Sequence, residues 1–120
     1  MCAPWRTDVD AALAQARTDR QPTVVMFHAV WAQASVDMRR QSLETPDVLR
    51  KLARFVLVQV NATDSEEPSV QALLARFRVA DLPTLLVLDA NGIEVARHTR
   101  YMSPEEILAE IGTYWREHPE

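Results

Sequence analysis

Three short apolar runs divide the chain, at residues 23–27 (TVVMF), 55–60 (FVLVQV) and 84–88 (TLLVL). Valine and leucine dominate them, and the apolar residues mostly follow one another instead of alternating with polar ones. Runs of this kind are typical of strands that are buried on both faces of a sheet flanked by helices. The pattern therefore predicts three central strands with helices packed against them.

Helical patterns lie between these runs. Before the first run, Val9, Leu13 and Ala16 follow the spacing of one helix face, and Thr7 is placed to cap the N-terminus of that helix. Proline is tolerated in the first turn of a helix, so Pro46 fits a helix start. The other helical stretches are Val36, Met38 and Leu43, then residues 47–53 after Pro46, and then Val70, Leu73, Leu74 and Phe77.

The last helix has the clearest start. Ser103 and Glu106 form a capping box, with Pro104 in the first helical position. The pair Asn91-Gly92 follows the third apolar run and is the strongest short signal for a β-hairpin, so residues 84–88 and 93–98 should be antiparallel neighbours. The buried face of the last helix is predicted from Ile107, Leu108, Ile111 and Trp115.

The predicted elements define an α/β domain. They are a short strand near Trp5, followed by helix, strand, helix, strand, helix, strand, strand and helix. Two right-handed β-α-β crossovers, a hairpin and a terminal helix together predict one three-layer domain. A length of 120 residues suits a single domain, and no repeat or linker divides residues 1–120.

Composition narrows the classes of function. Hydrophobic residues make up 48% of the chain, enough for a packed core, and the net charge is −4 at pH 7. Because no cluster of Lys or Arg stands out, we expect no nucleic-acid partner. No apolar stretch reaches the roughly 18 residues of a membrane span, and we expect no signal peptide in residues 1–10. The only cysteine is Cys2, which excludes an internal disulfide and a cysteine-based metal site.

The corner after the first run reads VWAQAS, residues 30–35, with Trp31 followed by two small residues, Ala32 and Ser35. Three segments resemble the thioredoxin superfamily, and within it the C-terminal domain of the DsbD thiol:disulfide interchange proteins. They are FHAVWAQAS, the PDV step at residues 46–48 followed by FVLVQVNATD, and FRVADLPTLLVLDANG. The resemblance covers nearly the whole chain and implies a thioredoxin-like three-layer sandwich, with a central mixed sheet and an antiparallel C-terminal hairpin.

The resemblance assigns roles to this corner. The family's two redox cysteines correspond to Ala32 and Ser35, and its cis-proline corresponds to Pro83. The family's proline faces the redox motif across a shallow groove, where the Leu82 backbone would be free to pair with an extended peptide. Without the resemblance, Pro83 would be explained simply as the end of a loop before a strand. The expected docking residues are Trp31, Gln33, Ala34, Leu82 and Pro83.

The chemistry of the family needs two thiols. The first cysteine is stabilised as a thiolate at a helix N-terminus and attacks a disulfide, and the second resolves the mixed disulfide. Ala32 offers no nucleophile, and the hydroxyl of Ser35 does not ionise without a base beside it. We therefore expect no thiol–disulfide exchange by this chain, and neither a cofactor nor a metal.

Other polar residues depart from the family or offer weaker candidates. Met26 stands where relatives often carry a buried aspartate that relays protons, and Arg39 stands where the DsbD-like domain carries an acid. Arg39 and Arg40 are expected to face outward. Ser35 with His28 could be imagined as a hydrolase pair, but no G-x-S-x-G turn is present.

The three histidines show no spacing typical of metal ligands. We expect His28 to border the groove or to pack beneath it. His98 and His118 are expected to be solvated.

Two interpretations remain open. In the first, the chain is a thiol–disulfide oxidoreductase domain of the thioredoxin/DsbD type that passes electrons to partner proteins, with its cysteines replaced by Ala32 and Ser35, through engineering or recent loss. In the second, it is a naturally cysteine-free binding or chaperone-like module that uses the same groove. Both predict a monomer that binds partner proteins or peptides between Trp31 and Pro83. The resemblance implies a periplasmic or other extracytoplasmic location, with the cytoplasm as the alternative.

Overall fold

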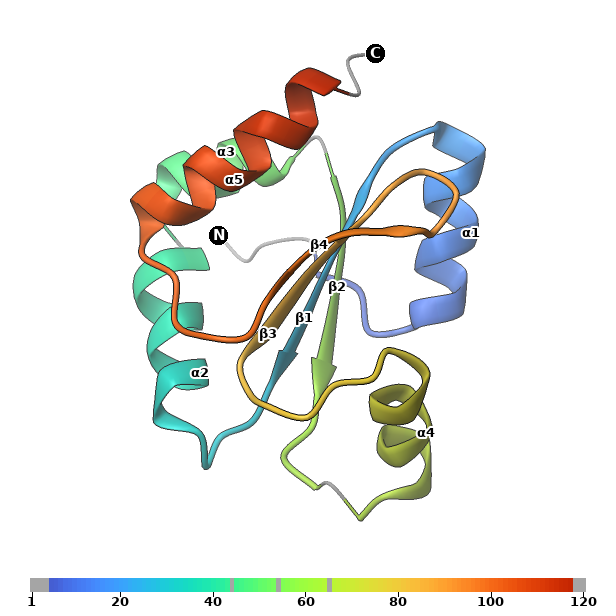
Figure 1. The fold of residues 1–120 in the computed structure, drawn as a ribbon, viewed down its shortest axis with the longest axis vertical. Coiled ribbons are helices and arrows are strands. Elements are labelled where there is room, and N and C mark those ends of the chain that lie inside the picture. The colour runs from blue at the N-terminus through green and yellow to red at the C-terminus, as the bar shows by residue number, and fades with distance from the viewer. Residues whose placement is uncertain (1–4, 44, 54, 65, 118–120) are drawn as a thin grey trace.

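Four strands form one sheet in the order β2-β1-β3-β4 (Figure 1). They are β1 (Thr23–His28), β2 (Val56–Asn61), β3 (Thr84–Leu88) and β4 (Glu94–His98). β2 is parallel to β1, β3 is antiparallel to β1, and β4 is antiparallel to β3, so the sheet is mixed. The structure is a computed structural model, and it describes residues 5–117 except residues 44, 54 and 65, without the side chains of 111–117.

Helices cover both faces of the sheet (Figure 1). One face carries α1 (Val9–Asp19) and α4 (Pro68–Arg76). The other carries α2 (Gln33–Asp37), its π-helical continuation η1 (Met38–Leu43), α3 (Pro46–Leu52) and α5 (Pro104–Glu117). This arrangement confirms the predicted three-layer α/β sandwich with a central mixed sheet and an antiparallel C-terminal hairpin.

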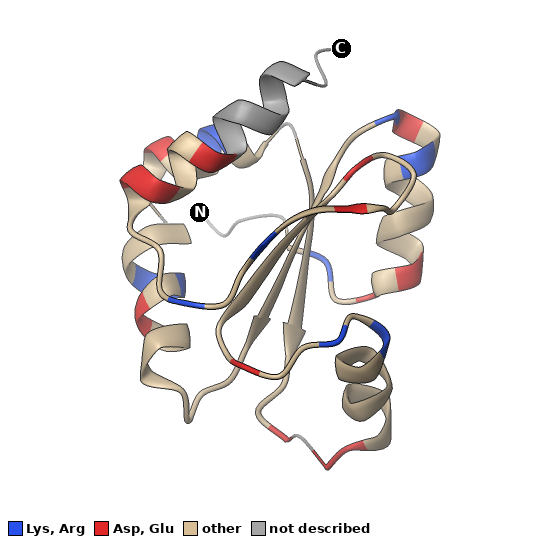
Figure 2. Cartoon of the chain, viewed as in Figure 1, with Lys and Arg blue, Asp and Glu red and all other residues tan. Residues whose placement is uncertain are grey.

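The strands are apolar on both faces because each face packs against helices. Val24 and Met26 of β1 belong to the core beneath η1, α3 and α5, whereas Val25 and Phe27 belong to the core beneath α1 and α4. Figure 2 shows that β1, β2 and β3 carry no acidic or basic residue, while charges lie on the helices, the loops and β4. The continuous apolar runs therefore reflect burial on both sides.

The prediction of a second parallel crossover is wrong, because β3 runs antiparallel to β1 and hence to β2. α4 has 9 residues and lies near the carboxyl ends of β1 and β2 (Figure 1). The chain therefore enters β3 from the end of the sheet at which it left β2. A parallel connection would have to carry the chain back along the whole length of the sheet.

Two predictions near the N-terminus need correction. Asp8, not Thr7, caps α1, and its carboxylate accepts a hydrogen bond of 3.1 Å from the Ala11 amide. A carboxylate is the stronger cap because it also interacts favourably with the positive end of the helix dipole. The strand expected near Trp5 is reduced to one parallel bridge between Arg6 and Val58.

The capping box of α5 is confirmed. Ser103 Oγ accepts a hydrogen bond from the Glu106 amide at 3.2 Å, and Glu106 Oε1 accepts one from the Ser103 amide at 3.0 Å. Of the predicted buried face, Ile107 is buried and Leu108 is half-buried. The predicted contacts of Ile111 and Trp115 fall on side chains outside the described residues.

Replacing Ser103→Ala should lower the free energy of unfolding by about 1 kcal/mol, because one amide of the first helical turn loses its acceptor. Urea unfolding followed by circular dichroism measures this loss. Ser69→Ala is the matched control, since Ser69 lies on the exposed first turn of α4 and its amide keeps its bond to Glu67. An equal loss in both variants would contradict the capping role of Ser103.

Candidate functional site

An exposed tryptophan marks the corner that follows β1. Val30 and Trp31 are 64% and 62% exposed, and large apolar side chains are otherwise mostly covered. The Trp31 indole Nε1 donates a hydrogen bond of 2.8 Å to the carbonyl of Thr63, and the Val30 amide donates one of 3.1 Å to Thr63 Oγ1. The ring is therefore held in place while its surface remains open to solvent, which favours contact with a partner.

Thr63 was missed in the sequence analysis. It follows β2, and the carboxyl ends of the parallel strands β1 and β2 meet at the same edge of the sheet. Asn61 in turn fixes Thr63, because its Oδ1 accepts bonds from both the amide and the hydroxyl of Thr63. The parallel pairing of the first two strands could have located Thr63 from the sequence, because it places residue 63 beside the corner.

The helix start contains no reactive group. Ala32 is the N-cap of α2, has extended φ/ψ angles of −97° and 105°, and makes no side-chain capping bond. Ser35 is completely buried, and among the described residues its Oγ has no hydrogen-bond partner. Gln33 is exposed and donates to Asp37 Oδ1 at 2.8 Å, while Ala34 is half-buried. The described residues include no thiol, and Cys2 lies outside them.

The other predicted part of the docking site, the Leu82–Pro83 segment, lies at the same end of the sheet as the corner. The Leu82–Pro83 peptide bond is cis, Pro83 is buried and Leu82 is half-buried. Because Phe27 pairs with Thr84 in antiparallel register, the chain before Thr84 runs alongside the chain that leaves β1. Among the described residues, no hydrogen bond satisfies the Leu82 backbone. The register thus brings the Leu82–Pro83 segment next to the residues that lead from β1 into the corner.

His28 and Arg39 form a polar contact at the end of β1. His28 is 4% exposed, and Arg39 Nη1 lies 3.5 Å from its Nδ1. Burial, and secondarily the charge of Arg39, lower the pKa of His28 to about 4. The imidazole is therefore neutral at pH 7. Met26, in the same strand, is buried and apolar.

The expectation that Arg39 faces outward is wrong, whereas Arg40 is exposed as predicted. The segment from Met38 is π-helical, so its residues advance around the axis differently from the 3.6-residue spacing used in the prediction. Arg39 consequently turns towards the end of β1, where His28 lies. Its side chain is half-buried.

The other histidine and metal candidates are weak. No hydrogen bond joins Ser35 to His28, whose partner is Arg39, so the structure assembles no hydrolase pair from them. His98 is not solvated as predicted but lies half-buried, with Nε2 3.1 Å from Glu110 Oε1. His118 falls outside the described residues. In the described part of the chain, no three acidic, His or Cys side chains gather as a metal site would need.

Comparison with known proteins places the chain in a family. The sequence model described as "Thioredoxin-like domain" matches residues 9–115. The thiol:disulfide interchange protein DsbD of Tatumella citrea is 35% identical over 106 residues, which cover 87% of this chain and 18% of that protein. DsbD of Escherichia coli K12 is 32% identical over the same share of each chain. The chain thus spans about a fifth of the length of these curated relatives.

Solved structures agree in fold. A thioredoxin from Thermus thermophilus superposes with a TM-score of 0.82 at 27% identity, covering 98% of this chain and 92% of that one. The reduced C-terminal domain of DsbD from Neisseria meningitidis superposes with a TM-score of 0.76 at 20% identity, covering 88% and 92%. At 20% identity, the similarity to the Neisseria domain shows a shared fold.

Among the described residues, no helix has the length and apolar character needed to cross a bilayer.

Proposed function

Because the chain belongs to the family of thioredoxin-like domains, we propose that it is a thiol–disulfide interchange domain of the DsbD type that keeps the partner-docking corner and lacks the redox pair. The main support for this proposal is the corner at residues 30–35. Trp31 is held at the surface by Thr63, the Leu82–Pro83 segment runs alongside, and Ala32 and Ser35 stand where the family has cysteines.

The missing redox step follows from chemistry. Thiol–disulfide exchange requires a thiolate to attack a disulfide sulfur and a second thiol to release the mixed disulfide. Ala32 has a methyl group at the first position. Ser35 has a buried hydroxyl at the second, without a base to remove its proton. In this form the domain binds partners and passes no electrons.

The buried hydroxyl of Ser35 favours replacement of a cysteine over a native serine. Buried hydroxyl groups are nearly always hydrogen-bonded in folded proteins, yet Ser35 Oγ has no partner in the part of the chain that the structure describes. A thiol tolerates such a site better because it behaves as a small apolar group with only a weak donor. We therefore favour a domain that has lost its thiols over a module that never had them.

Docking would use backbone pairing and apolar contact together. An extended polypeptide could pair with the unsatisfied Leu82 backbone and cover the exposed faces of Val30 and Trp31. Gln33, Ala34 and Pro83 complete the proposed surface. In this proposal the partners are proteins or peptides, the domain acts as a monomer, and its similarity to DsbD supports a location outside the cytoplasm.

The test is binding of an extended polypeptide that cannot react. Insulin B chain with carbamidomethylated cysteines should shift the amide NMR signals of residues 30–34, 82 and 84. Trp31→Ala should weaken binding at least about tenfold, since tryptophan is a frequent hot spot in interfaces.

Ile93→Ala is the matched control, because Ile93 is 61% exposed and lies beyond the opposite end of β3. It should bind like the unaltered chain. Signal changes confined to the hairpin around Ile93, or equal weakening by both substitutions, would refute the docking site.

A further inference from the structure

A cavity of about 390 Å³ opens beside the carboxyl ends of β1 and β2. Its lining combines polar side chains with an apolar wall. The apolar part includes Val70 and Leu73 of α4, and the polar part consists of Thr7, His28, Arg39, Gln59 and Asn61. The volume falls within the range of small-molecule sites, and a few convergent polar groups against an apolar wall are typical of them.

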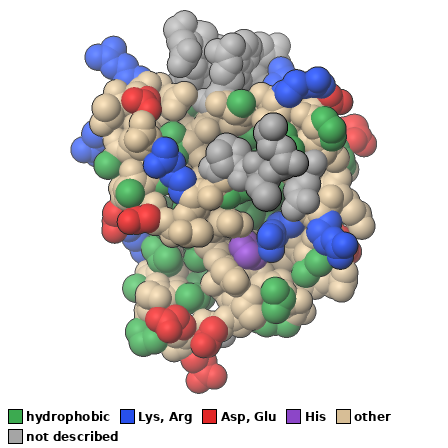
Figure 3. Space-filling model, turned by 180° about the vertical axis from the view of Figure 1, so that it is seen from behind, with side chains coloured by type: hydrophobic (Ala, Val, Ile, Leu, Met, Phe, Trp, Pro, Cys, Tyr) green, Lys and Arg blue, Asp and Glu red, His purple; other side chains and the backbone are tan. Residues whose placement is uncertain are grey.

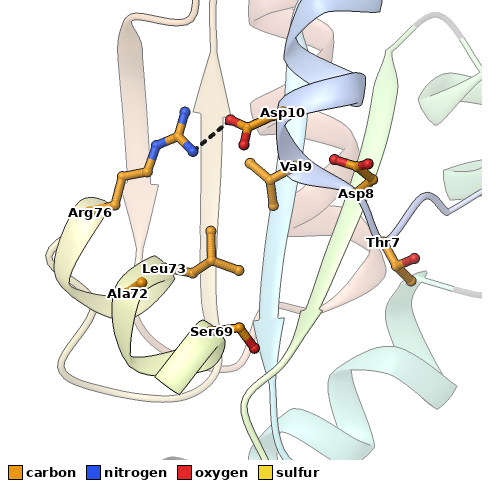
Figure 4. Close-up of a pocket in the computed structure, with 8 residues that line it drawn as sticks. All are labelled: Thr7, Asp8, Val9, Asp10, Ser69, Ala72, Leu73 and Arg76. Atoms are coloured by element: carbon orange, nitrogen blue, oxygen red, sulfur yellow. Dashed lines mark hydrogen bonds and ion pairs between the residues drawn. The ribbon is translucent and has the colours of Figure 1, made fainter. Parts of the chain in front are cut away.

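The cavity contains a cation, Arg39, that has no acidic partner among the described residues. None of the ion pairs between described residues involves Arg39, whose contact is with the neutral ring of His28. The neighbouring cavity of about 560 Å³, between α1 and α4, differs in this respect (Figure 4). There Arg76 is paired with Asp10 at 2.8 Å. The positive charge of Arg39 is thus open to an external anion.

His28 orients this cation and holds a second unsatisfied donor. A guanidinium can only donate, so Nδ1 of His28 accepts from Arg39 and the proton of the neutral ring lies on Nε2. Nε2 is buried and has no acceptor within the described part of the chain. Leaving a buried donor unpaired is unfavourable. On the face shown in Figure 3, a histidine lies beside basic side chains.

We propose that this cavity binds a carboxylate that carries a short aliphatic chain. Arg39 pairs with the two carboxylate oxygens, as guanidinium groups commonly do, and Thr7 and Gln59 supply further polar contacts. The aliphatic part lies against Val70 and Leu73. The carboxylate is either a free small acid or a glutamate side chain of a bound polypeptide. The site does not depend on the partner docking proposed for the corner.

The direct test titrates the full chain with sodium butyrate at pH 7 and constant ionic strength, followed by amide NMR. We expect saturable shifts at residues 28, 39 and 59. Arg39→Gln should weaken binding at least about tenfold, and Arg40→Gln should leave it unchanged. Arg40 is the matched control because it is the exposed neighbour of Arg39 on the same helical segment.

A second pair of variants tests the site in case Arg39→Gln does not fold. Gln59→Glu adds an acid to the cavity lining and should abolish binding by neutralising Arg39, whereas Gln71→Glu adds the same charge on the exposed face of α4. Butyramide, the neutral analogue of butyrate, should not saturate the site. Equal binding of butyramide, or equal loss in target and control variants, would overturn the proposal.

Two peptides distinguish the sources of the carboxylate. Acetyl-Ala-Glu-Ala-amide carries a single side-chain carboxylate, and acetyl-Ala-Gln-Ala-amide is its neutral counterpart. Saturation by butyrate alone supports a free acid, and saturation by the glutamate peptide supports a polypeptide source. If neither butyrate nor the glutamate peptide saturates residues 28, 39 and 59, the site does not exist. This outcome would leave the corner proposal intact, since that proposal is read at residues 30–34, 82 and 84.

Discussion

Restoring both cysteines, by Ala32→Cys together with Ser35→Cys, should convert an inert chain into a disulfide reductase. The two positions are three residues apart at the start of α2, so both sulfurs would lie on one helical turn. The first thiol would sit at the N-cap, where unpaired amides and the helix dipole favour the thiolate. We expect reduction of insulin by dithiothreitol to accelerate at least about tenfold over the uncatalysed reaction.

The two single-cysteine variants distinguish attack on a disulfide from release of the mixed disulfide. Ala32→Cys alone should trap partner proteins as stable mixed disulfides, because no second thiol releases them. Ser35→Cys alone should remain inert, because its thiol is buried. All variants carry Cys2→Ser so that the terminal thiol does not contribute. A double variant that is folded yet inert would instead support the naturally cysteine-free binding module.

The same substitution also reports on the origin of Ser35. A thiol at this buried position replaces a hydroxyl that has no partner among the residues described, so Ser35→Cys should not destabilise the fold. If the site evolved around a serine, the larger sulfur would instead be overpacked and stability would fall. The free energy of unfolding of this variant therefore separates a lost cysteine from a native serine.

The sequence was sufficient for elements whose environment is encoded locally. The apolar runs became β1, β2 and β3 because burial on both faces leaves no room for alternating polar residues. Asn91-Gly92 predicted the β3–β4 hairpin, where Gly92 has a φ of +84° that suits glycine. The resemblance supplied the positions of the corner, but the roles of its residues are still proposals.

What the sequence did not reveal depends on long-range geometry. The direction of β3 is set by how far α4 carries the chain along the sheet, and apolar spacing does not encode this distance. Thr63 holds Trp31 from 32 residues away in sequence. The inward turn of Arg39 results from π-helical winding, which follows no amphipathic pattern. The candidate carboxylate site depends on this turn, so it was invisible in the sequence.

Acidification from pH 6.5 to pH 4 should destabilise the fold through His28. Burial, followed by the positive charge of Arg39, lowers the pKa of this histidine from 6.5 to about 4. Between these values the unfolded chain binds a proton that the folded chain does not, so the stabilisation present above pH 6.5 is lost as the pH falls. The loss amounts to at most about 3 kcal/mol, given 1.36 kcal/mol for each pH unit.

Urea unfolding at several pH values between 4 and 7 measures this slope, and His28→Asn should flatten it. His98→Gln is the control, because His98 is half-buried beside Glu110 and should leave the contribution of His28 in place. Glu106 adds to the slope only near the acid end of this range, because its hydrogen bond with Arg100 lowers its folded pKa to about 2 from an ordinary value of 4.5. This contribution is the same in all variants, so the difference between the unaltered chain and His28→Asn isolates His28. An unchanged slope in His28→Asn would show that the ring is protonated as readily in the folded chain as in the unfolded one. Arg39 would then face a cation at mildly acidic pH, and His28 could not serve as its neutral acceptor.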